Sequence, residues 1–107
     1  MANAVETIEA ALIEDGTLFT LRELCRSSGA HAEVIIEMVE VGLLEPQGRD
    51  PSDWRFPPQS LTRIHSTLRL RRDLDVNLSG AALALDLMDE VARLRHRLHA
   101  LERQLGE

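Results

Sequence analysis

The sequence predicts a mainly α-helical protein with a winged helix-turn-helix domain over residues 1–76 and a long C-terminal dimerisation helix over residues 77–107. Three observations lead to this prediction. Two helix signatures follow one another closely between residues 20 and 42. A turn-rich segment that ends in an aromatic triplet comes next, and leucines then recur at heptad spacing toward the C-terminus. With 107 residues, the chain has room for one small domain and one extended helix.

Residues 4–14 have an ambiguous pattern that fits both an edge strand and a short helix. We favour a strand, because the following segment has its own helix start and the wing of a winged fold needs a strand to pair with. Asp15-Gly16 is a turn signal that would end this element.

The first helix of the helix-turn-helix begins after Thr20. Thr20 and Glu23 have the spacing of a capping box, and Phe19 and Leu24 are placed as a hydrophobic staple around it. Gly29 can adopt the left-handed conformation that ends a helix. We therefore expect a capped helix over residues 21–28.

The second helix, residues 33–42, is placed where a helix-turn-helix protein presents its recognition helix. At about 100° per residue, Glu33, Glu37 and Glu40 fall within an arc of about 60°. Three glutamates on a surface helix are usually only solvated, but their position on the presented helix makes them candidate partner-binding residues. The opposite side, which we expect to face the core, carries Val34, Met38, Val39 and Val41.

The wing and a third helix follow. Pro46 stops the second helix, residues 47–53 have turn chemistry, and residues 54–56 can form a short strand with Trp54 in the core beneath the wing. Pro58 suits the first turn of the third helix. The apolar face predicted for that helix carries Leu61, Ile64, Leu68 and Leu74.

The fourth helix is predicted from Asn77, a good N-cap, to about Leu105, a length of about 42 Å. Flanking charges can pair across a seam, Glu90 with Arg95 and Arg97 with Glu102. Self-association would bury the seam, and folding back onto the same chain is the alternative. Parallel and antiparallel pairing both remain open. The seam consists of Leu87, Val91, Leu94, Leu98, Leu101 and Leu105.

Charge and composition narrow the classes of partner. Residues 1–45 contain nine acidic residues and two arginines, a net charge of −7. Residues 46–107 contain nine acidic residues and ten arginines, a net charge of +1. An acidic N-terminal half disfavours nucleic acid and anionic membranes and favours a basic partner. No apolar run is long enough to span a bilayer, and no signal peptide is evident. The single cysteine, Cys25, suits a reducing cytoplasm and is expected to be a small buried hydrophobe.

The arginines and histidines do not form the sites that DNA binding, metal binding or catalysis would require. On the third helix the arginines point in about four directions, so we expect solvated charges and local ion pairs with Asp73 and Asp75 rather than a phosphate-tracking stripe. His96 and His99 lie outside the leucine seam beside arginines and are expected to be solvated. Neither a phosphate loop nor a nucleophile elbow occurs. We therefore expect no enzyme activity, no metal and no cofactor. The arginines in question are Arg63, Arg69, Arg71 and Arg72.

The order of these elements resembles the MerR-like winged-helix family. Within it, residues 23–25, 41–46, 54–56, 70–74 and especially 77–90 (NLSGAALALDLMDE) are similar to the CbpM family of chaperone modulators, and the match covers residues 19–105. MerR-type regulators typically carry an Arg-Tyr-Tyr-Glu run near the end of the second helix. The corresponding positions here are Ile36, Glu37, Met38 and Val39, so the phosphate-binding arginine is absent.

The resemblance implies a cytoplasmic protein that binds the J-domain of a CbpA-type co-chaperone and blocks its stimulation of DnaK. A J-domain presents a basic helix to its Hsp70, which fits an acidic binding face. The first candidate patch is Glu33, Glu37 and Glu40, and the second is Asp86, Asp89 and Glu90. A MerR-like DNA-binding transcriptional regulator is the alternative. The acidic segment 1–16 is longer than the family pattern and has no assigned role.

Overall fold

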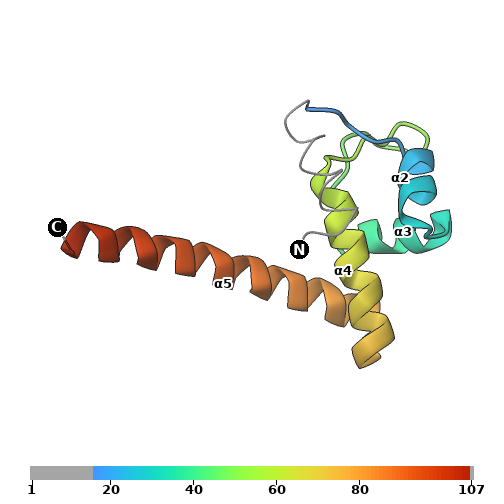
Figure 1. Ribbon diagram of the computed structural model, residues 1–107. Helices are drawn as coiled ribbons and strands as arrows, with labels where there is room; N and C mark the ends of the chain where they lie inside the picture. Colours follow the sequence, from blue (N-terminus) through green and yellow to red (C-terminus); the bar gives the residue numbers. More distant parts are fainter. Residues whose placement is uncertain (1–15, 107) are drawn as a thin grey trace.

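The computed structural model describes residues 16–106, and helices dominate this part of the chain. The helices in order are α2 (Leu21–Ser28), α3 (Ala32–Glu40), α4 (Gln59–Leu74) and α5 (Leu78–Leu105). Helices α2, α3 and α4 pack together, and α5 leaves this domain as an extended rod (Figure 1). The mainly α fold class with a long C-terminal helix is confirmed. The strand predicted for residues 4–14 lies outside the described residues.

The boundaries of α2 follow from its sequence as predicted. The Thr20 backbone N–H donates to Glu23 Oε1 over 2.9 Å, and the Glu23 N–H donates to Thr20 Oγ1 over 3.1 Å. The hydrogen bond that the Thr20 backbone N–H donates to the Glu23 carboxylate is the main reason that the pKa of Glu23 lies below its ordinary value. Gly29 ends the helix with a φ of 77°. Phe19 and Leu24, the predicted staple residues, are both buried.

Helix α3 ends at Glu40, two residues earlier than predicted. Gly42 has a φ of 80°, and the Leu43 N–H turns back to donate to the Met38 carbonyl over 2.9 Å. Val41 therefore lies beyond the regular helix and is 37% exposed, so its predicted place in the core is wrong. Ile35, which lies opposite the glutamates, takes that place with no exposed surface.

The wing consists of two isolated antiparallel bridges within the described residues. Phe56 pairs with Phe19, and Arg55 pairs with Gln47. Residues 54–56 therefore form no regular strand, in contrast to the prediction, and pair with other segments only through single antiparallel bridges. The Trp54 and Phe56 rings meet edge to face with centroids 5.8 Å apart, and both side chains are buried. Their burial confirms that Trp54 belongs to the core beneath the wing.

Helix α4 contributes Leu61 and Ile64 to the core, and Leu68 packs against it half-buried. Leu74, predicted for the same face, is 67% exposed because it is the last residue of α4 and extends past the packed region. Asp75 then takes the left-handed conformation with a φ of 55°, which turns the chain into α5.

Helix α5 begins at Asn77, whose side-chain oxygen accepts a hydrogen bond from the Gly80 N–H over 2.7 Å. Only its first two turns pack on the domain, through Leu78, Ala81, Ala82 and Leu85. Between residues 86 and 99 every side chain is exposed. Within residues 16–106, the chain does not fold back to cover the leucine seam, which was the alternative to self-association.

Candidate functional site

The acidic face of α3 is exposed and electrically uncompensated. Glu33, Glu37 and Glu40 are all exposed, and none of them forms an ion pair with any residue between 16 and 106. Glu40 lies in the last turn of the helix, where the helix dipole disfavours a negative charge. Its side chain therefore does not serve to stabilise α3. Within the described part of the chain, three exposed carboxylates without a paired cation suit this face to a basic partner.

Helix α3 begins without a side-chain cap. His31 precedes the helix as its N-cap, and its side chain makes no capping hydrogen bond. Glu33 in the first turn partly compensates, because a negative charge there interacts favourably with the helix dipole.

The second predicted patch is already occupied by arginines of this chain. Arg63 donates from Nη1 to Asp89 Oδ2 over 2.8 Å and from Nη2 to Asp86 Oδ1 over 3.5 Å. Within α5, Arg93 binds Glu90, and these hydrogen bonds lower the pKa of the Glu90 carboxyl. Each carboxylate of this patch has an internal partner, so it offers less net charge to another protein than the α3 face does.

Arg63 is the residue whose role the sequence did not reveal. It was expected to be a solvated charge, but its side chain is only 24% exposed and reaches from α4 to α5. The sequence feature that could have indicated this pairing is the spacing of Asp86 and Asp89, which are three residues apart and so lie on one face of their helix. The other expectation for α4, local pairing, is confirmed for Asp73, which forms an ion pair with Arg72, but Asp75 forms none with the described residues.

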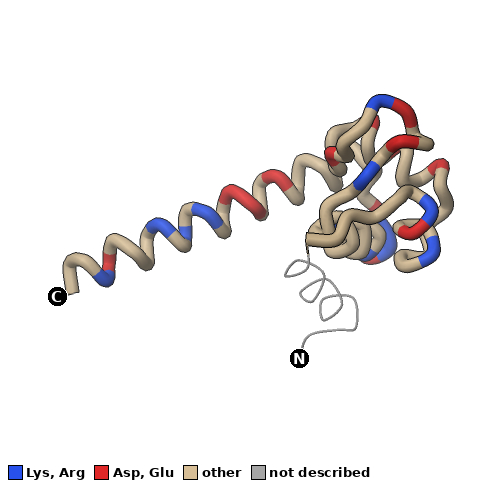
Figure 2. The backbone as a smooth tube through the Cα atoms, turned by 90° about the horizontal axis from the view of Figure 1, so that it is seen from above, with Lys and Arg blue, Asp and Glu red and all other residues tan. Residues whose placement is uncertain are grey.

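Charge alternates along α5 in blocks. Figure 2 shows acidic segments of α5 on the side of the domain, arginines farther out along the rod, and one more acidic segment beside an arginine near the C-terminal end. The leucine seam lies along one face of α5, and the charged residues lie on its other faces. Its six predicted residues are all between 47% and 88% exposed, and Leu83 at 62% extends the same stripe toward the domain. At about 100° per residue this stripe lies opposite the face that packs on the domain.

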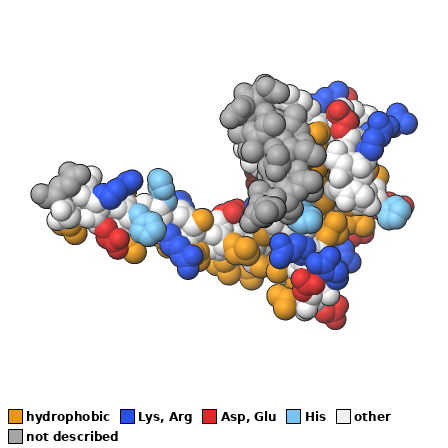
Figure 3. Space-filling model, in the orientation of Figure 1, with side chains coloured by type: hydrophobic (Ala, Val, Ile, Leu, Met, Phe, Trp, Pro, Cys, Tyr) orange, Lys and Arg blue, Asp and Glu red, His pale blue; other side chains and the backbone are white. Residues whose placement is uncertain are grey.

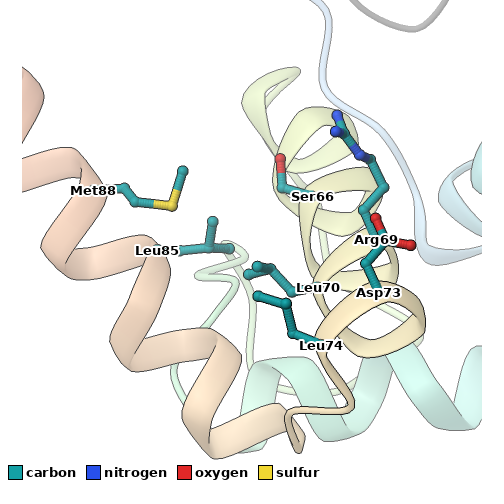
Figure 4. Close-up of a pocket in the computed structure, with 7 residues that line it drawn as sticks. All are labelled: Ser66, Arg69, Leu70, Asp73, Leu74, Leu85 and Met88. Carbon is teal, nitrogen blue, oxygen red and sulfur yellow. The ribbon is translucent and has the colours of Figure 1, made fainter.

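A groove of about 330 Å³ separates the end of α4 from α5. Leu70 and Leu74 point into it from α4, and Leu85 and Met88 point into it from α5 (Figure 4). In Figure 3, hydrophobic side chains gather where α5 leaves the domain and continue along the lower edge of the rod. An apolar stripe of this extent on a small protein is typical of a protein–protein interface.

Two other kinds of site were sought in the described part of the chain, a metal centre and a membrane-spanning helix. No group of three or more His, Cys, Asp or Glu between residues 16 and 106 could hold a metal ion. His96 and His99 are exposed, and Cys25 is half-buried against the core. The helices of this region are too short or too polar to cross a membrane. In the wing, Arg49 and Arg55 are exposed beside the similarly exposed Asp50 and Asp53.

Comparison with known proteins adds independent findings. The family described as MerR HTH family regulatory protein matches residues 19–103. A chaperone modulatory protein CbpM of Coxiella burnetii is 39% identical over 98 residues, which cover 92% of each chain. A protein of the same name from Pseudomonas putida is 40% identical over 86 residues, covering 80% of this chain and 85% of the relative. The Pseudomonas entomophila protein of that name is 36% identical over the same extent.

Proposed function

The chain belongs to the MerR-type helix-turn-helix family and, within it, to the chaperone modulatory proteins CbpM, and we propose that it binds the J-domain of a CbpA-type co-chaperone. By occupying the basic surface of the J-domain, it would prevent that domain from stimulating DnaK. Such a modulator acts by binding alone, in the cytoplasm, and needs neither a cofactor nor a metal.

The uncompensated acidic face of α3 carries the proposal. Glu33, Glu37 and Glu40 are exposed and lack ion pairs within residues 16–106. A basic helix placed along this face would pair with carboxylates that have no competing ion-pair partner among residues 16–106. We therefore rank this face above the patch of Asp86, Asp89 and Glu90, whose members already bind Arg63 or Arg93.

The same face argues against the alternative of a DNA-binding regulator. DNA affinity depends on arginine and lysine side chains that neutralise phosphates. Helix α3 contains neither residue type, and its exposed glutamates would repel the backbone of a duplex. The exposed wing arginines, Arg49 and Arg55, are accompanied by two aspartates. The charges of α3 therefore favour protein binding over DNA binding.

We further propose that two chains pair through the leucine stripe of α5. In the single chain this stripe is exposed, and it faces away from the chain's own domain. A second α5 would bury it and leave both α3 faces available, which allows two J-domains per dimer.

A calorimetric titration of the protein with the isolated J-domain of its CbpA-type co-chaperone tests the proposal. We expect one J-domain per chain and an affinity that falls steeply with salt. Raising the salt from about 0.1 M to about 1 M shortens the Debye length from about 10 Å to about 3 Å and so weakens an interface based on charge. The absence of heat at both salt concentrations and at two temperatures would overturn the proposal, and duplex DNA would then be the next ligand to titrate.

A further inference from the structure

The direction of α5 is determined over a very short contact. Beyond Leu85, the last residue of α5 in the core, about 20 residues and about 30 Å of helix project from the domain. The apolar contact at the base is made by two leucines and two alanines. Burial of apolar surface is non-directional, so this contact resists separation of α5 from the domain more than it resists tilting.

Arg63 makes a directional contact at the place where α5 leaves the domain. Besides Asp86 and Asp89 on α5, it binds the turn after α3, because its Nε donates to the Leu43 carbonyl over 2.8 Å. One guanidinium thus connects α4, the end of the helix-turn-helix and α5. Its planar fork has the geometry to serve three acceptors at once, which the single ammonium of a lysine does not match.

We propose that Arg63 is the positioning residue that sets the angle between the helix-turn-helix and α5. For each tilt of about 10° at Asp89, a residue 14 positions farther along the rod moves by about 4 Å. In the dimer proposed above, the same tilt would change how the two acidic α3 faces are spaced. That functional consequence rests on the proposed function, whereas the angle itself is a property of the single chain.

Spin labels on the domain and near the tip of the rod measure this angle directly. Cys25→Ser removes the native thiol, and Ser27→Cys with Arg103→Cys provides two exposed sites, one on α2 and one on α5 away from the leucine stripe. Labelled protein is diluted into a large excess of unlabelled chain, so that only distances within one chain are recorded by electron–electron double resonance. No J-domain is present in this experiment.

Three variants remove the contact in different ways, and one provides a matched control. Arg63→Met removes the guanidinium, Arg63→Lys keeps the charge without the fork, and Asp86→Asn with Asp89→Asn removes the acceptor charges but leaves the bond from Arg63 to Leu43. Arg93→Met removes the ion pair to Glu90, which lies wholly within α5. The control therefore loses an ion pair of the same kind without losing a contact to the domain.

We expect a single narrow distance distribution in the parent protein and in Arg93→Met. The distribution should shift or broaden by about 4 Å or more in Arg63→Met and in the double asparagine variant, with Arg63→Lys in between. High salt should broaden the parent distribution but leave that of Arg63→Met unchanged, because the carboxylates are exposed to screening ions. Narrow, unshifted distributions in both Arg63→Met and the asparagine variant would overturn the inference, and so would equal broadening in Arg93→Met.

Should Arg63→Met fail to fold, the asparagine variant still decides the question. The outcome is independent of the proposed function, since a J-domain that does not bind in the titration would leave the distances within one chain unaffected. Conversely, a protein that binds the J-domain with an unchanged angle in every variant would refute only the role of Arg63.

Discussion

Reversing charge on α3 is the perturbation that most directly tests how this protein recognises its partner. Glu33→Lys with Glu37→Lys changes the net charge of the exposed α3 face by +4 without touching a buried residue. Glu33 lies in the first helical turn, where a lysine opposes the helix dipole and costs about 0.3–1 kcal/mol. A second pair, Glu37→Lys with Glu40→Lys, places its outer lysine in the last turn, where the dipole favours it.

The expected magnitude follows from the exposure of these side chains. Two unit charges about 4 Å apart attract one another by about 1 kcal/mol in water. This value applies, rather than the larger one for a protein interior, because all three glutamates are exposed. Reversal replaces attraction with equal repulsion, a change of about 2 kcal/mol per residue and about 4 kcal/mol per pair. Since about 1.4 kcal/mol corresponds to a tenfold change, each pair should weaken J-domain binding close to a thousandfold.

Calorimetric titration with the J-domain measures the loss of affinity in each variant, and circular dichroism verifies that each variant remains folded. Asp50→Lys with Asp53→Lys is the matched control, since it makes the same change in net charge at two exposed wing residues. The control should weaken binding far less than either α3 pair. Unchanged affinity in both α3 pairs would refute the reasoning and direct attention to Asp86, Asp89 and Glu90. A loss only in the pair containing Glu33 would indicate damage to α3 instead.

Three further predictions concern assembly and stability. Leu94→Asp with Leu98→Asp should convert the proposed dimer to monomers in sedimentation velocity, because unpaired charge in an apolar seam is costly. His96→Asp, on the face away from the stripe, should leave the proposed dimer intact. Thr20→Ala should lower the free energy of unfolding by about 1 kcal/mol in urea, since it removes the hydroxyl that caps α2; an unchanged urea midpoint would show that the cap is dispensable. Finally, the pKa of Glu23 is lowered below 4.5 in the folded protein, so its contribution to stability is fully present above that pH and disappears as the pH falls through the lower folded value. Glu23→Gln should flatten this acid limb of the stability curve, and parallel curves for both proteins would contradict the assignment.

Local patterns allowed much of the fold to be predicted. The capping box of Thr20 and Glu23, the left-handed Gly29 and the Asn77 cap involve residues at most five apart, so their geometry is set within one or two helical turns. The leucine stripe and the acidic face of α3 were predictable for a similar reason, because helical periodicity alone places residues on a face.

The errors arose where periodicity was followed past the end of a helix and where contacts join distant parts of the chain. Val41 continues the apolar pattern of α3, but the left-handed Gly42 ends the helix before the pattern ends. Leu74 was predicted on the apolar face of α4, but it is the last residue of that helix and is 67% exposed. The pairing of Arg63 with Asp86 and Asp89 joins residues 23 and 26 positions apart. That pairing depends on how α4 and α5 cross, which no local pattern specifies.

The long unpacked part of α5 has a consequence for how the protein responds to its own abundance. Helices without tertiary partners are only marginally stable in water, and the outer part of this rod gains such partners only from a second chain in the proposed dimer. Completion of the helix and assembly would then be one equilibrium that depends on the square of the chain concentration. A cell that halves its supply of the protein would lose more than half of the proposed dimer, which carries two α3 faces. The amount of active modulator would therefore change more steeply than the amount of protein that is synthesised or degraded.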